Sequence, residues 1–427
     1  MIYKNMKNMN FFESVAHHNL ERFHSECISW AFNSSEKMLL NFLENAANHD
    51  NILDITDAEV HCERYNIDIL VSYKMSDTHH FIHIENKIKA NEHIIAVNPQ
   101  KVEEEYNGIA KDTPLSQTQY YFVRNKAEIE KELSNGEPAK WHYLYLLPAV
   151  DDSKPKNMWD SDLIEENHWK TISYWDIINS MPIDSDNKIF ADYRSYLASQ
   201  FLGDDHSNPY QVEIKSENIS TVAINECLKP DTKILKAYGL RLHFEAVAKE
   251  LENFVKNVYP NVPFEVKFLT ETGNNGGYLL EVFTTAILKS PNPTIFGKPG
   301  PIEFRIGFQF EQNKTGKGKF KYYFADLEYK AGVIKESGKE KYHESVGGTE
   351  GILNTIFGEA TLEKCRKGKN KLRFNKSTSK SFCSYLIDKF SFTDKEDLQD
   401  TFKAEIKTLV DSLVKNNFKE ILYQKFN

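Results

Sequence analysis

A chain of 427 residues exceeds the usual size of one domain, so its length predicts two. Its composition, 40% hydrophobic and 27% charged, is ordinary for a soluble globular protein, and no apolar run approaches the ~20 residues that span a bilayer. The net charge of −9 argues against a protein that binds nucleic acid through its overall charge. We also expect no membrane partner.

Five scattered cysteines bear on the cellular compartment. Their number is odd, and no Cys-x-x-Cys pair is present, so neither a zinc site nor a disulfide framework is indicated. The first residues also lack the apolar core of a signal peptide. We therefore expect a reduced, cytoplasmic setting.

The first 200 residues alternate between predicted helices and strands. A stripe of apolar residues at helical spacing predicts a helical segment over 13–48. Predicted strands follow at 57–62, 66–71, 81–88 and 141–147, with a polar turn at 72–80, a helix from 99 and another after 172. This alternation predicts an α/β core.

A polar segment with little periodicity, residues 203–231, marks the predicted junction between domains 1–202 and 203–427. After a predicted helix at 235–258, apolar residues recur at every second position. The predicted elements are strands at 264–268, 278–287, 302–310 and 320–329 and a closing helix at 398–422. The second domain is therefore expected to be α+β with an antiparallel sheet.

The most informative feature is Asp68 followed, after sixteen residues, by Glu85-Asn86-Lys87. Both elements lie in apolar, β-branched runs, where a charged residue is costly to bury without a partner. Side chains alternate along a strand, so Glu85 and Lys87 share a face. If the two strands pair as a hairpin, Asp68 lies beside them.

Two carboxylates with a neighbouring lysine suit a particular chemistry. Carboxylate oxygens bind Mg²⁺ or Mn²⁺, which polarise phosphodiesters. A lysine ammonium beside the cation can orient a water molecule or stabilise the transition state. The pattern therefore indicates phosphodiester hydrolysis, and the alternative is an ordinary salt bridge between Lys87 and a carboxylate in a sheet.

Three segments, in order, resemble motifs of a bacterial branch of the PD-(D/E)xK nuclease superfamily. Glu21 to Ser25 matches E-x-x-H-S, and Ile84 to Ile88 matches I-E-N-K-I. The R-x-x-D motif corresponds to Arg64 and Asp68, which here have three residues between them. The resemblance extends to about residue 180 and implies a restriction-endonuclease-like mixed sheet flanked by helices. It further implies that Asp68 and Glu85 bind the metal and that Lys87 is catalytic.

The resemblance also implies accessory residues. An acidic residue one strand earlier would be a further metal ligand, for which Glu59 is the candidate and Glu63 competes. Glu21 and His24 carry the helical motif, and His24 has two interpretations, a contact to substrate phosphate or helix packing. The branch usually continues with Q-L-x-x-Y, whereas here Gln100 precedes its tyrosine by six residues instead of four, which puts its accessory role in doubt.

His83 shares the face of Glu85 in the predicted strand. Two interpretations are open for this histidine. It is either a hydrogen-bonded neighbour of the site or a contact of the metal shell.

Charge is unevenly divided along the chain. Residues 1–200 hold 19 Lys and Arg against 32 Asp and Glu, a net of −13, whereas the remainder holds 34 against 30, a net of +4. The acidic part fits a metal site, and lysine-rich loops of the second part supply phosphate contacts. The predicted nucleic-acid-binding residues are Lys367, Lys369, Lys371 and Arg373. The alternative is a solvated loop.

These features together predict a Mg²⁺- or Mn²⁺-dependent nuclease, an endo- or exonuclease acting on DNA more readily than RNA, in restriction or antiphage defence. The second domain would serve recognition, sensing or assembly, with a second copy of the chain or a defence-system protein as further partners. One alternative is a catalytically silent nucleic-acid-binding or scaffold protein that keeps the nuclease fold. Another, a small-molecule phosphohydrolase, would need phosphate-binding glycines, which the first half lacks near the motif.

Overall fold

The computed structural model describes these parts of the chain: residues 12, 20–47, 52–88, 94–95, 115–116, 129–134, 136–150, 169–183, 187–203, 218–229, 232–270, 277–288, 302–313, 318–326, 373–374, 382–387, 389–415 and 420. The chain forms two compact units. One comprises Met1–Ser216 with Lys233–Tyr238, and the other comprises Glu217–Thr232 with Gly239–Asn427. The division after Ser216 lies within the polar segment 203–231 that the sequence indicates as the junction.

A five-stranded mixed sheet with the order β1-β2-β3-β6-β7 forms the centre of the first unit. The strands β1 (Ile55–Arg64), β2 (Ile67–Met75) and β3 (Thr78–Asn86) pair antiparallel. The strands β6 (Ala139–Leu147) and β7 (Trp169–Ser173) are added in parallel. The mixed α/β class predicted from the alternation of elements is confirmed.

Tight turns determine the register of the antiparallel strands. Tyr65 and Asn66 join β1 to β2 with φ angles of 58° and 59°, the signs of a type I′ hairpin turn. Asparagine tolerates this left-handed backbone better than most residues, whereas tyrosine is strained there. The pairs from Arg64–Ile67 to Glu59–Ser72 follow from this two-residue turn, and the register then shifts by one residue between Glu59 and Thr56.

The turn between β2 and β3 is shorter than the predicted polar turn at 72–80, which was wrong in length. Both strands continue through this range and pair up to Met75 and Thr78. Only two residues, Ser76 and Asp77, form the turn, and Ser76 has a φ of 55°. Polar side chains near the strand ends misled the prediction, because pairing of the backbone continues there regardless of side-chain polarity.

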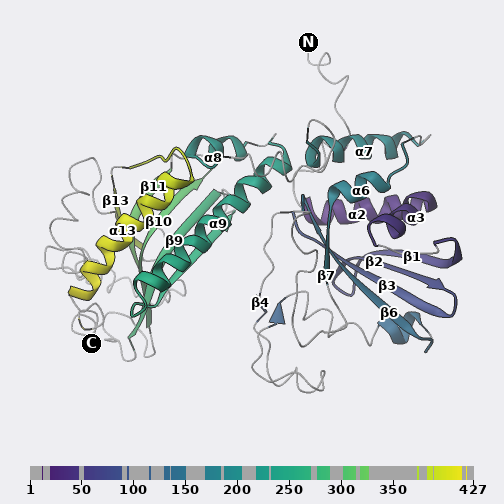
Figure 1. The fold of residues 1–427 in the computed structure, drawn as a ribbon, viewed down its shortest axis with the longest axis horizontal. Coiled ribbons are helices and arrows are strands. Elements are labelled where there is room, and N and C mark those ends of the chain that lie inside the picture. The colour runs from purple at the N-terminus through teal and green to yellow at the C-terminus, as the bar shows by residue number, and fades with distance from the viewer. Residues whose placement is uncertain are drawn as a thin grey trace, which may run out of the picture. The chain divides into compact units, whose positions relative to one another are not determined.

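Helices lie along one face of this sheet (Figure 1). They are α2 (Leu20–Ser34), α3 (Glu36–Asn45), α6 (Tyr174–Ser180) and α7 (Lys188–Phe201). The helical segment predicted over 13–48 is divided at Ser35, whose side chain caps α3 by accepting a hydrogen bond from the backbone N–H of Met38 at 3.2 Å. The first unit also has a short 3₁₀ helix, Ile52–Asp54, and a small pair of strands, β4 (Ile94–Ile95) and β5 (Leu115–Ser116).

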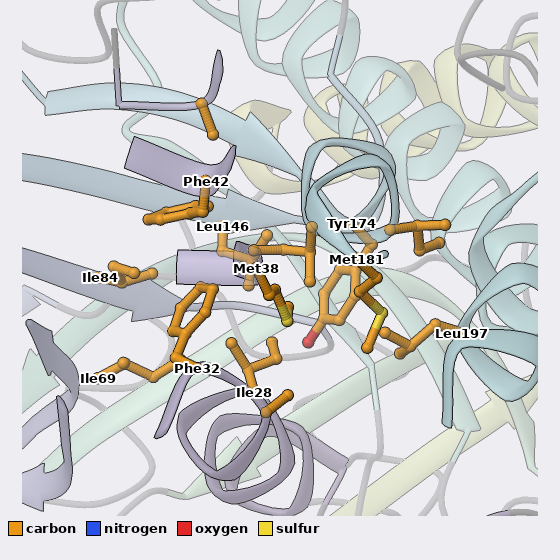
Figure 2. Close-up of a cluster of buried hydrophobic side chains, with 14 of the residues drawn as sticks. Ile28, Phe32, Met38, Phe42, Ile69, Ile84, Leu146, Tyr174, Met181 and Leu197 are labelled. Carbon is orange, nitrogen blue, oxygen red and sulfur yellow. The ribbon is translucent and has the colours of Figure 1, made fainter. Parts of the chain in front are cut away.

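The main hydrophobic core of the first unit lies between the sheet and these helices (Figure 2). Ile69, Ile84 and Leu146 of the strands meet Ile28 and Phe42 of the helices, and all five are fully buried. Each such side chain contributes ~1.5–3 kcal/mol by its burial. The helix-covered face is thus structural, and alternation along the strands directs Asp68 and Glu85 to the other face.

The second unit is built on a six-stranded sheet with the order β12-β13-β11-β10-β9-β8, all of whose pairs are antiparallel. Its strands are β8 (Phe264–Thr270), β9 (Gly277–Leu288), β10 (Ile302–Asn313), β11 (Lys319–Asp326), β12 (Arg373–Phe374) and β13 (Phe382–Leu386). The helices that follow α7 are α8 (Thr221–Cys227), α9 (Ile234–Val258) and α13 (Lys395–Lys415). The antiparallel sheet predicted for this part of the chain is confirmed.

The hydrophobic core of the second unit joins its sheet to α9 and α13. Phe304, Ile306 and Phe308 occupy alternate positions of β10 and so share one face of the sheet. They belong to one buried cluster with Phe244 of α9 and Phe402 of α13. The rings of Phe308 and Phe402 meet edge-on, with centroids 5.1 Å apart. Within the described part of the chain, no helix is both long and apolar enough to cross a bilayer.

Candidate active site

Asp68 and Glu85 lie opposite each other on β2 and β3. Ile69 pairs with Ile84, and this register places Asp68 across from Glu85 on the face away from the helices. Lys87 follows the end of β3, and its backbone N–H donates a hydrogen bond to the carbonyl of Leu146 at 2.9 Å. The structure therefore brings together the three residues that the sequence singled out.

The side chains of Lys87 and Glu85 form a buried ion pair. Lys87 Nζ lies 2.6 Å from Glu85 Oε1, and the two side chains are 8% and 2% exposed. Burial alone would raise the pKa of Glu85, but the neighbouring His83 and Lys87 hold that pKa below its ordinary value. Burial likewise opposes the charge on Lys87, yet the carboxylates of Glu85 and Asp68 keep its pKa above the ordinary value. Both members of the pair are thus charged at neutral pH.

Asp68 has a different electrostatic environment. Its Oδ2 accepts a hydrogen bond from the backbone N–H of Asn86 at 2.7 Å. Burial, followed by the negative charge of Glu85, raises the pKa of Asp68 to about 8. Without a cation, the Asp68 carboxyl therefore holds a proton at neutral pH, and a divalent cation between the two carboxylates would displace it.

Two buried polar atoms beside the ion pair lack hydrogen-bond partners among the described residues. They are Glu85 Oε2 and His83 Nε2, which lie 3.6 Å apart. The His83 side chain is 1% exposed, so water does not reach it from the surface. The two atoms face each other, and they form an ion pair when the imidazole is protonated.

Asn86 connects the site to the helical layer. Its side-chain Nδ2 donates to the carbonyl of Glu21 at 3.0 Å and to Ser25 Oγ at 3.2 Å. Its Oδ1 accepts from the Tyr174 hydroxyl at 2.9 Å. The Glu21 carboxylate in turn accepts from the backbone N–H of Ile88 at 3.0 Å. The E-x-x-H-S segment of α2 thus binds directly to the segment that carries Lys87.

Neither Asn86 nor Tyr174 is among the site residues predicted from the sequence. A signal existed for Asn86, because an amide between Glu85 and Lys87 must point to the opposite face of the strand, where apolar residues are expected. No local pattern marks Tyr174, which approaches only through packing of α6 on the sheet.

The structure favours helix packing as the role of His24. Its ring is fully buried and lies against Tyr174, Tyr193, Tyr196 and Phe201. Its Nδ1 is 3.3 Å from the Tyr193 hydroxyl. Burial lowers the pKa of His24 to about 3, so the ring is neutral and offers no charge to a phosphate.

Glu59 does not join the pair of carboxylates. It pairs with Ser72 in the sheet, is exposed, and lies with its Oε2 3.2 Å from His61 Nε2. The register of β1 with β2 instead places Glu63 opposite Asp68, and the charge of Glu63 contributes to the raised pKa of Asp68. The choice of Glu59 over Glu63 depended on strand register, which the sequence does not show.

The remaining predictions lie mostly outside the described residues. This holds for the helix expected from residue 99, for Gln100, and for Lys367, Lys369 and Lys371. Arg373 belongs to the short strand β12, where it pairs with Ser384 of β13. The proposed phosphate-binding role of these residues stays a prediction.

The carboxylates of Asp68 and Glu85 suit a cation that is bound partly by the protein and partly by the substrate. Among the residues that the structure describes, no three His, Cys, Asp or Glu side chains are arranged as a metal-binding group. Mg²⁺ is commonly bound by one or two carboxylates together with water and substrate phosphates, rather than by a cage of protein ligands. Asp68 and Glu85 meet that smaller requirement.

Comparison with known proteins identifies no relative of this chain. No family model, no curated protein and no solved structure matches this chain. A function must therefore be argued from the chemistry of the site itself.

Proposed function

We propose that the first unit hydrolyses phosphodiester bonds with a divalent cation, and that its substrate is nucleic acid, DNA in preference to RNA. The observation that carries this proposal is the meeting of Asp68, Glu85 and Lys87 on one face of the sheet, where the Glu85 side chain is 2% exposed. Burying two carboxylates beside each other costs free energy, and it raises the pKa of Asp68. A divalent cation between them would offset that cost.

Asp68 and Glu85 would hold Mg²⁺ or Mn²⁺ through their oxygens. When bound, the cation would supply the positive charge that polarises a phosphodiester. Lys87 carries no acceptor and cannot bind a cation while protonated. Held by Glu85 Oε1, its ammonium is available to orient a water molecule or to stabilise negative charge on the phosphate.

The resemblance to the PD-(D/E)xK nucleases supports this proposal. It implies a mixed sheet flanked by helices, and the five-stranded mixed sheet of the first unit, packed against helices, is compatible with it. A restriction-endonuclease-like core and a role in restriction or antiphage defence belong to the proposal. The second unit would then serve recognition, sensing or assembly.

The test is a cleavage assay with the full chain and Mg²⁺ or Mn²⁺ on linear and circular duplex DNA, single-stranded DNA and RNA. Lys87→Ala is compared with Lys74→Ala, a lysine of the same sheet whose Nζ lies 2.7 Å from Glu137 Oε2. We expect the wild type and Lys74→Ala to cleave the substrate. The cleavage rate of Lys87→Ala should be lower by about 10²-fold or more. Cleavage by Lys87→Ala at the wild-type rate would refute the proposal.

The second candidate is a catalytically silent nucleic-acid-binding or scaffold protein. The compact Lys87–Glu85 pair favours it, because an ion pair of this kind can be structural. So does the lack of a three-residue metal group within the described ranges. Calorimetry distinguishes the two, since a silent protein would bind nucleic acid without binding Mn²⁺ through Asp68 and Glu85.

A further inference from the structure

We propose that strand β8 joins two copies of this chain, by pairing antiparallel with β8 of a second copy about a two-fold axis at Val266. This interface belongs to the second unit and is independent of the proposed activity of the first. The pairing would extend the six-stranded sheet into one continuous sheet across both copies.

Strand β8 forms one edge of the six-stranded sheet. Its inner side pairs with β9 along the whole strand, from Phe264–Thr284 to Thr270–Tyr278. Within the part of the chain that the structure describes, no strand pairs with its outer side. The outer side of an edge strand presents a row of N–H and C=O groups that can pair with a strand from another chain.

The apolar side chains of β8 are incompletely covered at this edge. Phe264, Val266 and Phe268 belong to the core side of the strand, but only Phe264 is buried and the other two are partly buried. Their cross-strand neighbours on β9, Val282 and Leu280, are fully buried. A further strand beside β8 would cover this apolar surface, as β8 itself covers β9.

The charges on the other face of β8 are complementary to those of a second β8. Glu265 and Lys267 are exposed and lie on either side of Val266. In an antiparallel pair centred on Val266, Glu265 of each copy lies opposite Lys267 of the other. Phe264 of each copy likewise lies opposite Phe268 of the other. Opposite charges and aromatic side chains in directly opposed positions both stabilise a strand pair.

The same charges select this register over its neighbours. In a symmetric antiparallel pair, the two-fold axis places one residue opposite its own copy. An axis at Glu265 or at Lys267 would place two like charges opposite each other, which is destabilising. An axis at Phe264 or at Phe268 would leave both charges without an opposite charge across the interface. Val266 is therefore the favoured centre.

Charged residues on an edge strand commonly prevent unwanted strand pairing. The Glu265–Lys267 pattern would do so against most strands, but it matches a second copy of itself. Exposed ion pairs contribute little to affinity, so these charges would determine the partner and the register. Backbone hydrogen bonds and the covered apolar surface would supply the affinity.

The experiment measures the mass and the dimer dissociation constant of the full chain by sedimentation equilibrium. Glu265→Lys and Lys267→Glu each make both charge pairs across the interface repulsive. A mixture of these two variants restores both opposite-charge pairs between unlike copies. Circular dichroism and thermal melting check that each variant folds.

Glu252→Lys is the matched control, because it reverses the charge of an exposed glutamate on α9 instead of β8. A mixture of Lys267→Glu with Glu252→Lys has the same net charges as the mixture of the two β8 variants. It restores only one of the two charge pairs, so it controls for a general attraction between oppositely charged chains.

We expect the wild type and Glu252→Lys to be dimers. In each β8 variant alone, the dissociation constant should rise by about tenfold or more, because two attractive cross-strand pairs become repulsive. The mixture of Glu265→Lys with Lys267→Glu should recover the dimer, and the control mixture should recover it less well.

A wild type that is monomeric throughout its soluble range would overturn the proposed interface, whether or not β8 then accepts a strand of another protein. A dissociation constant that is unchanged in the folded β8 variants would also overturn it, because the copies would then associate through another surface. Failure of the mixture to recover the dimer would do the same. None of these outcomes bears on the proposed function, which the cleavage assay tests.

Discussion

The carboxylate of Glu21 accepts a hydrogen bond from the backbone N–H of Ile88 at 3.0 Å, although the two residues are 67 positions apart in the sequence. Asn86, on the other side of Lys87, is bound through its side chain to Glu21 and Ser25. The backbone is thus held on both sides of Lys87. Helix α2 therefore helps to determine where the lysine ammonium lies.

Glu21→Ala should disturb this arrangement, whereas Glu21→Gln should preserve it. Alanine leaves the Ile88 N–H without its acceptor, which should lower the free energy of unfolding by about 1–3 kcal/mol. The cleavage rate should also fall, because Lys87 would no longer be held in a fixed position. Glutamine keeps an oxygen at the same place. Urea denaturation and single-turnover cleavage check this, and equal behaviour of the alanine variant and the wild type would contradict it.

Lys87→Ala should destabilise the protein far more than Lys74→Ala. Removing Lys87 leaves the Glu85 carboxylate buried without its counter-charge, at a cost of about 3–5 kcal/mol. Lys74 and Glu137 form a more exposed pair, with side chains 26% and 42% exposed, and solvent screening makes its loss cost far less. Chemical denaturation measures both. Similar losses in the two variants would show that the Lys87–Glu85 pair is not buried as described.

Asp68→Asn should stabilise the metal-free protein at alkaline pH. The pKa of Asp68 is raised from 3.8 to about 8, so the folded state binds a proton more tightly than the unfolded state. The free energy of unfolding contributed by this group therefore falls as pH rises from about 4 to about 8. Asparagine keeps an acceptor for the Asn86 N–H and removes this loss, so its advantage should grow by up to about 1.4 kcal/mol per pH unit between pH 4 and pH 8. Urea denaturation with a chelator at pH 5, 7 and 9 checks it, and parallel curves for the two proteins would speak against it.

His24→Phe should make the protein less sensitive to acid. Burial lowers the pKa of His24 from 6.5 to about 3, so below pH 6.5 the unfolded state takes up a proton that the folded state does not. Stability is therefore lost as pH falls from 6.5 towards 3, by about 1.4 kcal/mol per pH unit. Between pH 7 and pH 5, the variant should gain about 2 kcal/mol relative to the wild type. Urea denaturation at the two pH values measures this, and an unchanged difference between the two proteins would contradict the prediction.

Replacement of Lys367, Lys369, Lys371 and Arg373 by alanine should weaken the binding of duplex DNA and its dependence on salt. Each lost phosphate contact should flatten the slope of log K against log salt by about 0.9. Exposed lysines of α9 and α13, Lys249 and Lys407, provide the control. Fluorescence anisotropy at several salt concentrations measures the slope. If the slope and affinity are unchanged, these residues form only a solvated surface.

The pairing of the strands with Asp68 and Glu85 was predictable because it depends on local information. Apolar residues at alternate positions indicate strands, and the alternation itself assigns Glu85 and Lys87 to one face. The same reasoning predicted the antiparallel sheet of the second unit. These features follow from the alternation of side chains along a strand, which has a period of two residues. Such alternation can be recognised within a short stretch of sequence.

Only the tertiary structure decided which distant residues meet at the site. The register of β1 against β2 places Glu63, and not Glu59, opposite Asp68. Packing of α2 and α6 on the sheet brings Glu21 and Tyr174 to the segment around Lys87. The sequence alone determined that charged residues lie in apolar strands. The partners of these charged residues depend on contacts between segments far apart in the chain. The local periodicity of the sequence does not reveal such contacts.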